Sequence, residues 1–469
     1  MTVPQQFPWH RPGSALTFPR DEGWHRVLPF QLANPSLEHM EWVYLNAHVE
    51  EVGGQHRRFV VFAAYFTQHL RFLVVRAWDQ SKHRLGTWTG SAWGVLRPSE
   101  QGLDLSFSHL GGTDTWKPLH KPDGSVRPFC SRLVARDDAA HFAVDVELIP
   151  TKAPYEVGGI GHLPFGSRGS FDYYSLTRLD VEGQLSLTMP SGAVESVHVK
   201  GLGWFDHQWG PFFVTPFRVP LLEQYEWMSV QLESNDELML TTVWDGANNT
   251  PSREAFGGAG WIRADGTNDR IVDAFLWKRR GFWRSPGQGA VYSSGWTFEA
   301  PQWGASLTIT PRQLDQLTPI IDPPLPGLLG TVVAPVLGGA PNYLGEFWEG
   351  SCDVEGQFNG SYVRGVAFAE LIKRYDDPRV ELEVVRRDPG LTVLGWRVTN
   401  PDPQVKLVSR AYLERPDGSV VRTWSTLTLP VLVLDDPTLP RGVPLVARVV
   451  MESEDGTLKG TATKTLTLS

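Results

Sequence analysis

The sequence predicts an all-β protein. Helical periodicity is scarce, short runs of alternating apolar and polar residues recur along the chain, and Gly, Pro, Asn and Asp separate these runs. Strands at such spacing, with turn residues between them, are typical of β-sandwiches and β-barrels. At 469 residues the chain is too long for one ordinary core, so we expect more than one domain.

The strand patterns run through most of the chain. In the first half they cover residues 57–66, 69–78, 141–149, 183–189 and 195–204. In the second half they cover residues 227–232, 237–244, 305–310 and 360–371. Successive side chains of a strand point to opposite faces, so each run predicts one face toward a core.

The pattern changes after about residue 375, where the strands are shorter and aromatic residues are few. "ERPDGSVV" is a hairpin signal with Asp-Gly at its turn. A small immunoglobulin-like sandwich over residues 375–469 fits this pattern. No residue pattern there indicates chemistry, so we interpret this part as a packing or partner module.

Charge and composition exclude several classes of function. The net charge is −9, and no stripe of Lys and Arg suggests a nucleic-acid partner. Cys130 and Cys352 are too far apart for a disulfide framework or a CxxC metal site, and the histidines show no repeated ligand spacing, so no metal is expected. No signal peptide is apparent at the start, which predicts a cytoplasmic location.

The segment 318–340 is apolar and nearly uncharged, with Asp322 as its only ionisable side chain. Its prolines and glycines exclude a stable helix, and therefore a membrane-spanning one. Two interpretations stay open. The segment is either a buried loop, which we favour, or an apolar flap that contacts a membrane peripherally or closes over a cavity.

"GLGWFDHQWG", residues 201–210, places an acid and an imidazole among aromatic residues, where ionised groups are costly to bury. In an extended strand Trp204, Asp206 and Gln208 share one face, and Phe205, His207 and Trp209 share the other. Asp206 and His207 then cannot face the same cavity unless a bulge intervenes. The alternative is a turn in which Asp206 accepts backbone N–H bonds and His207 caps a loop.

Carboxylates stand beside tryptophans at three further places. Glu41 precedes Trp42, with Tyr44 two residues on; Glu226 precedes Trp227; and Glu349 follows Trp348. A single pair of this kind means nothing, because tryptophan usually packs in a core. Their recurrence suggests a cavity lined by indoles and carboxyl groups.

Four stretches together resemble the carotenoid 1,2-hydratase/AttH family. They are "LEHMEWVYLNAHVEEVGGQHRRFVVFAAYF", "DYYSLTRLDVEGQL", "VKGLGWFDHQWG" and "FWEGSCDVEG". The resemblance covers about residues 20–372, and Val43 stands where the family more usually has an aromatic residue. It implies two tandem lipocalin-like β-barrels, over residues 1–218 and 219–374, and no organic cofactor. The C-terminal sandwich lies outside it.

The resemblance also implies a chemistry, because the family includes hydratases of acyclic carotenoids and of an isoflavonoid. Protonating an alkene needs a carboxylic acid kept neutral by an apolar pocket, and aromatic faces that stabilise the carbocation. We expect Asp206 to be the acid, ahead of Glu41 and Glu226, with His207, Tyr44 or Gln208 orienting the water. The expected aromatic walls are Trp42, Tyr65, Tyr174, Trp204, Trp209, Trp227 and Trp348.

Two other functions fit the same residues. Lipocalin-like relatives include cyclases and Diels–Alderases, which need a shaped hydrophobic cavity and one or two hydrogen-bond donors. A non-catalytic carrier of a hydrophobic ligand would need no acid in its cavity. In all three cases the expected partner is a hydrophobic small molecule, such as a polyene. Whether a carboxyl group faces the cavity would discriminate between these functions.

Overall fold

The computed structural model describes residues 13–25, 40–67, 69–164, 170–210, 223–245, 250–251, 258–272, 274–287, 289–319, 346–402, 405–427 and 429–469. Over these residues the secondary structure is β-strand with a few short 3₁₀ helices and no α-helix, which confirms the predicted fold class. No helix in this part of the chain is long and apolar enough to cross a membrane. Most of the 318–340 segment lies outside the described residues, so its predicted role stays a prediction.

The first domain is a closed barrel of ten strands. They are β1 (Met40–Glu51), β2 (Arg58–Phe66), β3 (Leu70–Trp78), β4 (Arg84–Pro98), β5 (Leu105–His109), β6 (Gly112–His120), β7 (Val126–Asp137), β8 (Phe142–Pro150), β11 (Ser170–Thr188) and β12 (Val194–Gly210). The order is β11-β12-β1-β2-β3-β4-β5-β6-β7-β8, and β8 pairs with β11 to close the barrel. The short elements η1 (Arg20–Glu22), β9 (Tyr155–Glu156), η2 (Val157–Gly159) and β10 (His162–Pro164) accompany it.

The second domain is a half-barrel, whose main sheet has the order β17-β16-β14-β13-β25-β24-β22-β21-β18. Its strands are β13 (Glu223–Leu232), β14 (Glu237–Asp245), β16 (Gly258–Ile262), β17 (Asn268–Ile271), β18 (Leu276–Arg279), β21 (Trp296–Ala300), β22 (Ala305–Pro311), β24 (Glu346–Phe358) and β25 (Ser361–Leu371). Smaller elements are β15 (Thr250–Pro251), β19 (Phe282–Arg284), β20 (Val291–Ser293), η4 (Pro301–Trp303) and β23 (Leu317–Pro319).

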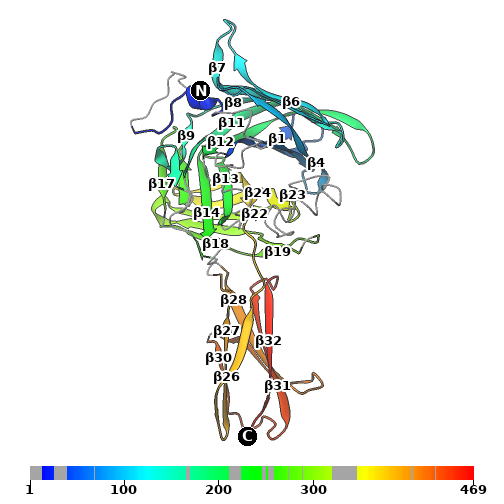
Figure 1. The fold of residues 1–469 in the computed structure, drawn as a ribbon, viewed down its shortest axis with the longest axis vertical. Helices are drawn as coiled ribbons and strands as arrows, with labels where there is room; N and C mark the ends of the chain where they lie inside the picture. The colour runs from blue at the N-terminus through cyan, green and yellow to red at the C-terminus, as the bar shows by residue number, and fades with distance from the viewer. Residues whose placement is uncertain are drawn as a thin grey trace.

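The C-terminal part is a two-layer sandwich, which projects away from the barrel in Figure 1. One sheet contains β26 (Val380–Asp388), β27 (Leu391–Val398) and β30 (Val431–Leu434); the other contains β28 (Leu407–Glu414), β29 (Val420–Leu427), β31 (Pro444–Ser453) and β32 (Lys459–Thr467). Buried Leu394, Trp396 and Val449 belong to the apolar core between the layers. The layers and their core match the predicted sandwich, and the residue boundaries of the three domains stay predictions.

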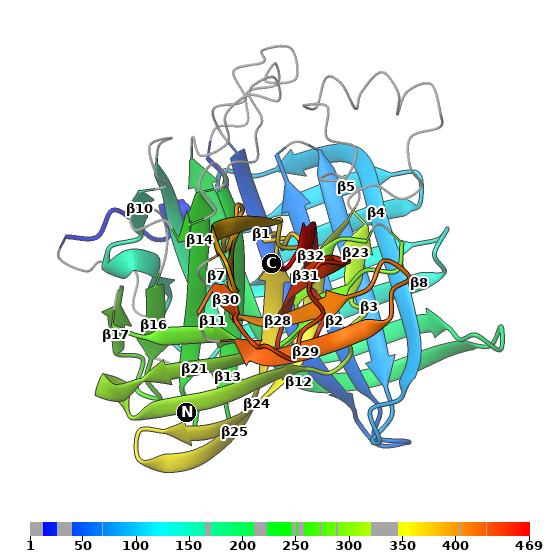
Figure 2. The same cartoon turned by 90° about the horizontal axis from the view of Figure 1, so that it is seen from below.

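The barrel and the half-barrel pack face to face, as Figure 2 shows with the blue strands β2 to β4 on one side and the green strands β13, β14 and β16 on the other. The shared apolar cluster includes Tyr44, Phe62 and Trp204 of the barrel, and Trp227 and Phe368 of the half-barrel. Strands β1 to β3 are therefore buried on both faces, which explains why "RFVVFAAYF" shows little alternation.

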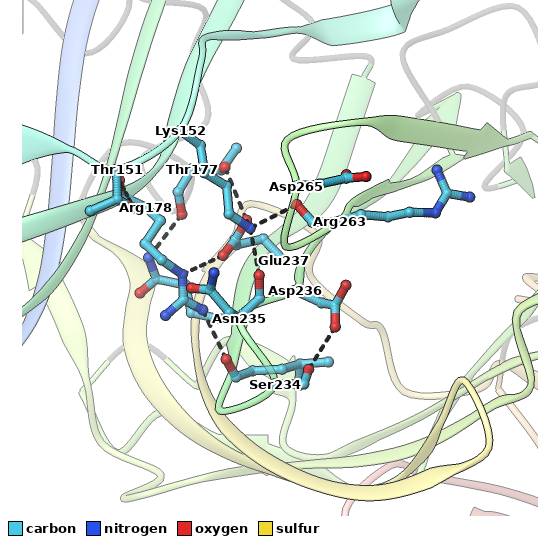
Figure 3. Close-up of polar contacts among 12 residues, drawn as sticks. Thr151, Lys152, Thr177, Arg178, Ser234, Asn235, Asp236, Glu237, Arg263 and Asp265 are labelled. Carbon is cyan, nitrogen blue, oxygen red and sulfur yellow. Dashed lines mark hydrogen bonds and ion pairs between the residues drawn. The ribbon is translucent and has the colours of Figure 1, made fainter. Parts of the chain in front are cut away.

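A buried ion cluster joins the same two domains (Figure 3). The carboxylate of Glu237 on β14 contacts Lys152 Nζ at 2.7 Å and also accepts a hydrogen bond from Arg178 Nε of the barrel. Arg178 Nη2 donates to the carbonyl of Leu232 at 2.8 Å, and Lys152 Nζ donates to the carbonyl of Arg263 at 2.9 Å. These bonds fix the orientation of the half-barrel against β11.

Closure of the barrel depends on Gly183, at the point where β11 meets β8. A Cβ atom at this position would lie 2.1 Å from the carbonyl oxygen of Asp145. We expect Gly183→Ala to lower the free energy of unfolding by about 1–3 kcal/mol, because overpacking displaces backbone here. Chemical denaturation measures this, with Gly287→Ala as the control, since an added Cβ there meets nothing within 4 Å. Equal stability of both variants would contradict the prediction.

Candidate active site

The motif strand β12 pairs regularly with β1, and the bulge opposite it lies on β11, so the side chains of β12 alternate between two buried compartments. Its pairing with β1 runs without a shift from Met40↔Gly210 to Glu51↔Val199. Asp206 consequently faces the half-barrel, whereas His207 faces the barrel interior, as expected for a strand without a bulge. The motif is a strand and not the turn that was its alternative.

Asp206 lies in a polar cluster between the domains, which we call the interface cluster; it contains Tyr44, Tyr173, Ser175, Trp204, Asp206, Tyr225, Trp227, Glu349 and Glu370. Oδ1 of Asp206 accepts hydrogen bonds from Ser175 Oγ at 2.6 Å and from Trp204 Nε1 at 2.7 Å. Burial raises the pKa of Asp206 to about 7, although its hydrogen bonds partly offset this effect. The group is therefore available as an acid near neutral pH.

Two glutamates of the half-barrel face the same cluster. Glu349 on β24 pairs in register with Glu370 on β25. Tyr44 OH donates to Glu349 Oε2 at 3.2 Å, and Tyr225 OH donates to Glu370 Oε1. Burial raises the pKa of Glu370 to about 7, and burial together with the Glu370 charge raises the pKa of Glu349 well above its usual range. The interface cluster thus holds carboxyl groups whose pKa values are raised to neutral pH or above it.

Aromatic rings surround these carboxyl groups. The ring of Trp227 lies edge-to-face with Tyr44 at 5.7 Å and with Trp204 at 6.0 Å. Trp227 Nε1 is buried and has no hydrogen-bond partner among the described residues. The cluster therefore combines carboxyl groups of raised pKa, the faces of aromatic rings and the N–H donor of Trp227.

A second polar cluster lies inside the barrel, on the other face of β1 and β12; we call it the barrel cluster. His207 Nε2 lies 2.8 Å from Glu41 Oε1, and His25 Nδ1 lies 3.0 Å from the same oxygen. Trp209 stacks on His25 with ring centroids 3.9 Å apart, and Tyr174 contacts the edge of His207. Glu41, His207, Trp209 and Tyr174 are thus separated from Asp206 by the sheet itself.

The remaining predicted residues lie in several places. Tyr65 is inside the barrel, where its hydroxyl donates to Asp114 at 3.0 Å. Glu226 lies on the opposite face of β13 from Trp227 and binds Arg279, and Trp348 lies in the core of the half-barrel. Trp42 packs against Phe66 beside the interface cluster, and Gln208 is half-buried on the Asp206 face of β12.

The structure therefore brings together Tyr44, Trp204, Asp206, Trp227 and Glu349 from the residues that the sequence analysis singles out. It adds Tyr173, Ser175, Tyr225 and Glu370, which the sequence interpretation did not single out. Alternation gives a signal for Tyr225, because it shares a face with Trp227 two residues on. Glu370 has no such signal, since its position opposite Glu349 depends on the pairing of β24 with β25.

Comparison with known proteins identifies a family and a fold. The sequence model of the AttH-like family matches residues 112–374. The structure is similar to that of an AttH protein from Nitrosomonas europaea, with a TM-score of 0.53 and 20% identity over 77% of this chain and 98% of that one. It is also similar to kievitone hydratase from Nectria haematococca, with a TM-score of 0.50 and 15% identity over 71% and 88% of the two chains.

CghA in complex with Sch210972 gives a TM-score of 0.43 and 12% identity, over 71% of this chain and 88% of CghA. No curated protein matches this chain.

Proposed function

Because the chain belongs to the AttH-like family, we propose that it is a cofactor-independent hydratase that adds water across an isolated C=C bond of a hydrophobic polyene, such as an acyclic carotenoid. One observation supports the reaction above others: burial in the interface cluster raises the pKa of Asp206 to about 7, and aromatic rings surround its carboxyl group. Kievitone hydratase is by name a hydratase, so this fold is compatible with the reaction.

In the proposed reaction Asp206 is the general acid. Its carboxyl proton forms a new C–H bond with one alkene carbon, and the π electrons of the double bond leave a carbocation on the other carbon. The faces of Trp204 and Trp227 would stabilise this cation. A water oxygen then bonds to the cation, and the proton it loses returns to the Asp206 carboxylate, so the enzyme is regenerated.

Asp206 is preferred over the two glutamates because of how it is held. Two donors fix one of its oxygens, and a pKa of about 7 lets both its acid and its base form exist at neutral pH. Glu349 and Glu370 each accept a tyrosine hydroxyl and face one another across a strand pair. We assign them the binding of the attacking water.

The test is incorporation of ¹⁸O from labelled water. Purified protein would be incubated with lycopene or neurosporene in detergent micelles, and the products would be analysed by mass spectrometry. We expect a labelled hydroxyl product from the wild type and about 10²- to 10⁴-fold less from Asp206→Asn, because the general acid is lost. Asp145→Asn, which removes a surface carboxylate paired with Arg132, is the control and should match the wild type.

Other outcomes would overturn the proposal. Equal labelling by the wild type and Asp206→Asn would exclude Asp206 as the acid. Binding of the polyene without any product would indicate a carrier. An unlabelled product of unchanged mass would indicate a cyclase, which is the second candidate function. The N–H donor of Trp227 beside Tyr44 favours this candidate, because a pericyclase needs such a donor to polarise its substrate.

A further inference from the structure

The barrel cluster brings together three atoms of the kinds that bind metal ions. His25, Glu41 and His207 each offer one ligand atom, and these three atoms all lie within 4.8 Å of one another. Each imidazole nitrogen is already within 3.0 Å of the same carboxylate oxygen. A zinc ion bound at its usual ligand distances separates its ligand atoms by roughly 3–3.5 Å, so only small shifts would admit it.

Both the position and the orientation of these ligands are fixed by the fold. Glu41 on β1 and His207 on β12 are diagonal neighbours on the inner face of a regular strand pair. The backbone N–H of His25 donates to Glu41 Oε2 at 2.9 Å, and the Trp209 ring stacks on the imidazole. The other nitrogen of His25 lies 3.0 Å from Asp21 Oδ1. A carboxylate on the far nitrogen is what a metal-bound histidine usually has.

Unpartnered polar groups around the cluster point independently to a missing ligand. Glu41 and His207 are fully buried. Nδ1 of His207, the hydroxyl of Tyr174 and Nε1 of Trp24 are also buried and have no hydrogen-bond partner in the described part of the chain. The rings of Tyr174 and Trp24 lie 5.5 and 6.0 Å from that of His207. Because buried polar groups are almost always satisfied, a bound group or its water is expected here.

We propose that His25, Glu41 and His207 bind one divalent transition-metal ion inside the first barrel. Two imidazoles and one carboxylate are donors that suit Zn²⁺, and three protein ligands leave a fourth position for water. With both histidines neutral, the dication would balance the negative charges of Asp21 and Glu41. Ligands that are 16 and 166 residues apart in the chain explain why no histidine spacing indicated the site.

The ion would fasten the N-terminal segment 13–25 to the barrel. Leu16, Phe18 and Trp24 of this segment are buried in the barrel core, and His25 is its last described residue. A metal bound by one ligand from the segment and two from the barrel strands contributes its binding free energy to folding. This role is independent of the proposed hydration, because Asp206 lies on the opposite face of β12.

The test is metal binding by the full-length protein after chelator treatment. We expect one equivalent of Zn²⁺ by calorimetry and mass spectrometry of the metal, and one equivalent of Co²⁺ with the visible absorption of a nitrogen-bound ion. His25→Gln and Glu41→Gln should lose this equivalent. His162→Gln is the matched control and should retain it, because His162 also contacts an aspartate, at 2.7 Å, but has no second histidine.

The variant Asp21→Asn tests whether the barrel cluster is a metal site or only a cluster of histidines. It leaves all three ligands in place and should weaken Zn²⁺ binding about 10- to 100-fold, because Asp21 orients His25. Absence of a stoichiometric Co²⁺ spectrum in the wild type would overturn the proposal even if a variant failed to fold. Equal affinity of His25→Gln, Glu41→Gln and His162→Gln would also overturn it and leave the cluster as a hydrogen-bond network.

Discussion

Asp206→Asn is expected to make the protein more stable above neutral pH while removing the proposed hydratase activity. The carboxyl group is fully buried, and burial raises its pKa from the ordinary 3.8 to about 7. The asparagine oxygen can still accept the hydrogen bonds from Ser175 and Trp204, but the amide never ionises. The substitution therefore removes the free-energy cost of a buried charge and keeps the local packing.

The pH window follows from the direction of the pKa shift. Between about pH 4 and pH 7 the unfolded chain has lost the Asp206 proton while the folded chain keeps it, so the free energy of unfolding falls as pH rises. Above pH 7 Asp206 is ionised in both the folded and the unfolded state. The difference between its two pKa values then lowers the free energy of unfolding by its full amount, about 4 kcal/mol. Below about pH 4 both states are protonated and the wild type suffers no loss.

Urea unfolding at pH 5 and pH 8 would measure this effect. The advantage of Asp206→Asn over the wild type should grow from pH 5 to pH 8 and approach 4 kcal/mol as an upper limit. Asp145→Asn should follow the wild-type pH dependence, because its surface ion pair with Arg132 contributes about 0–1 kcal/mol. An Asp206→Asn curve parallel to that of the wild type would show that Asp206 ionises like an ordinary aspartate.

Glu237→Gln should destabilise the contact between the barrel and the half-barrel strongly. Glu237 is fully buried, and its loss would leave the cations of Lys152 and Arg178 without the carboxylate that both of them contact. Breaking one partner of a buried ion cluster typically costs about 3–5 kcal/mol. The loss should be visible in thermal unfolding, and as a separation of the unfolding transitions of the two domains.

Two further variants test whether the unpaired charges cause the loss of stability in Glu237→Gln. Glu182→Gln, which removes an exposed carboxylate near Lys200, should change the free energy of unfolding by less than about 1 kcal/mol. Replacing Lys152, Arg178 and Glu237 together by apolar residues should restore much of the stability lost in Glu237→Gln, because no unpaired charge remains. A triple variant as unstable as Glu237→Gln would point to packing and not to charge.

Local sequence determined much of the fold and half of the site. Alternation along "WFDHQW" was enough to predict that Asp206 and His207 point in opposite directions, because strand geometry is local. The strand patterns likewise predicted β2, β3, β8 and β14 to within one residue at each end.

The other contacts of the site depend on pairings between strands that are far apart in the chain, and a single sequence does not show which strands pair. Glu370 reaches Asp206 only because β25 pairs with both β13 and β24, and the half-barrel then covers β12. Glu41 meets His207 only because β1 pairs with β12, and His25 reaches both from the N-terminal segment. Nor could the sequence show that Glu226, which is next to Trp227, belongs to an ion pair with Arg279 on the other face.

Because β12 is buried on both faces, a substitution in this strand has a different effect from an insertion or a deletion. Substitutions at even-numbered positions of 204–208 alter the compartment between the domains, while those at odd-numbered positions alter the barrel, so the two can diverge independently in evolution. A single-residue deletion or insertion in this strand would exchange the faces of every residue beyond it. It would move an imidazole into the acid compartment and a carboxyl group into the barrel, so β12 should tolerate substitution far better than any change in length.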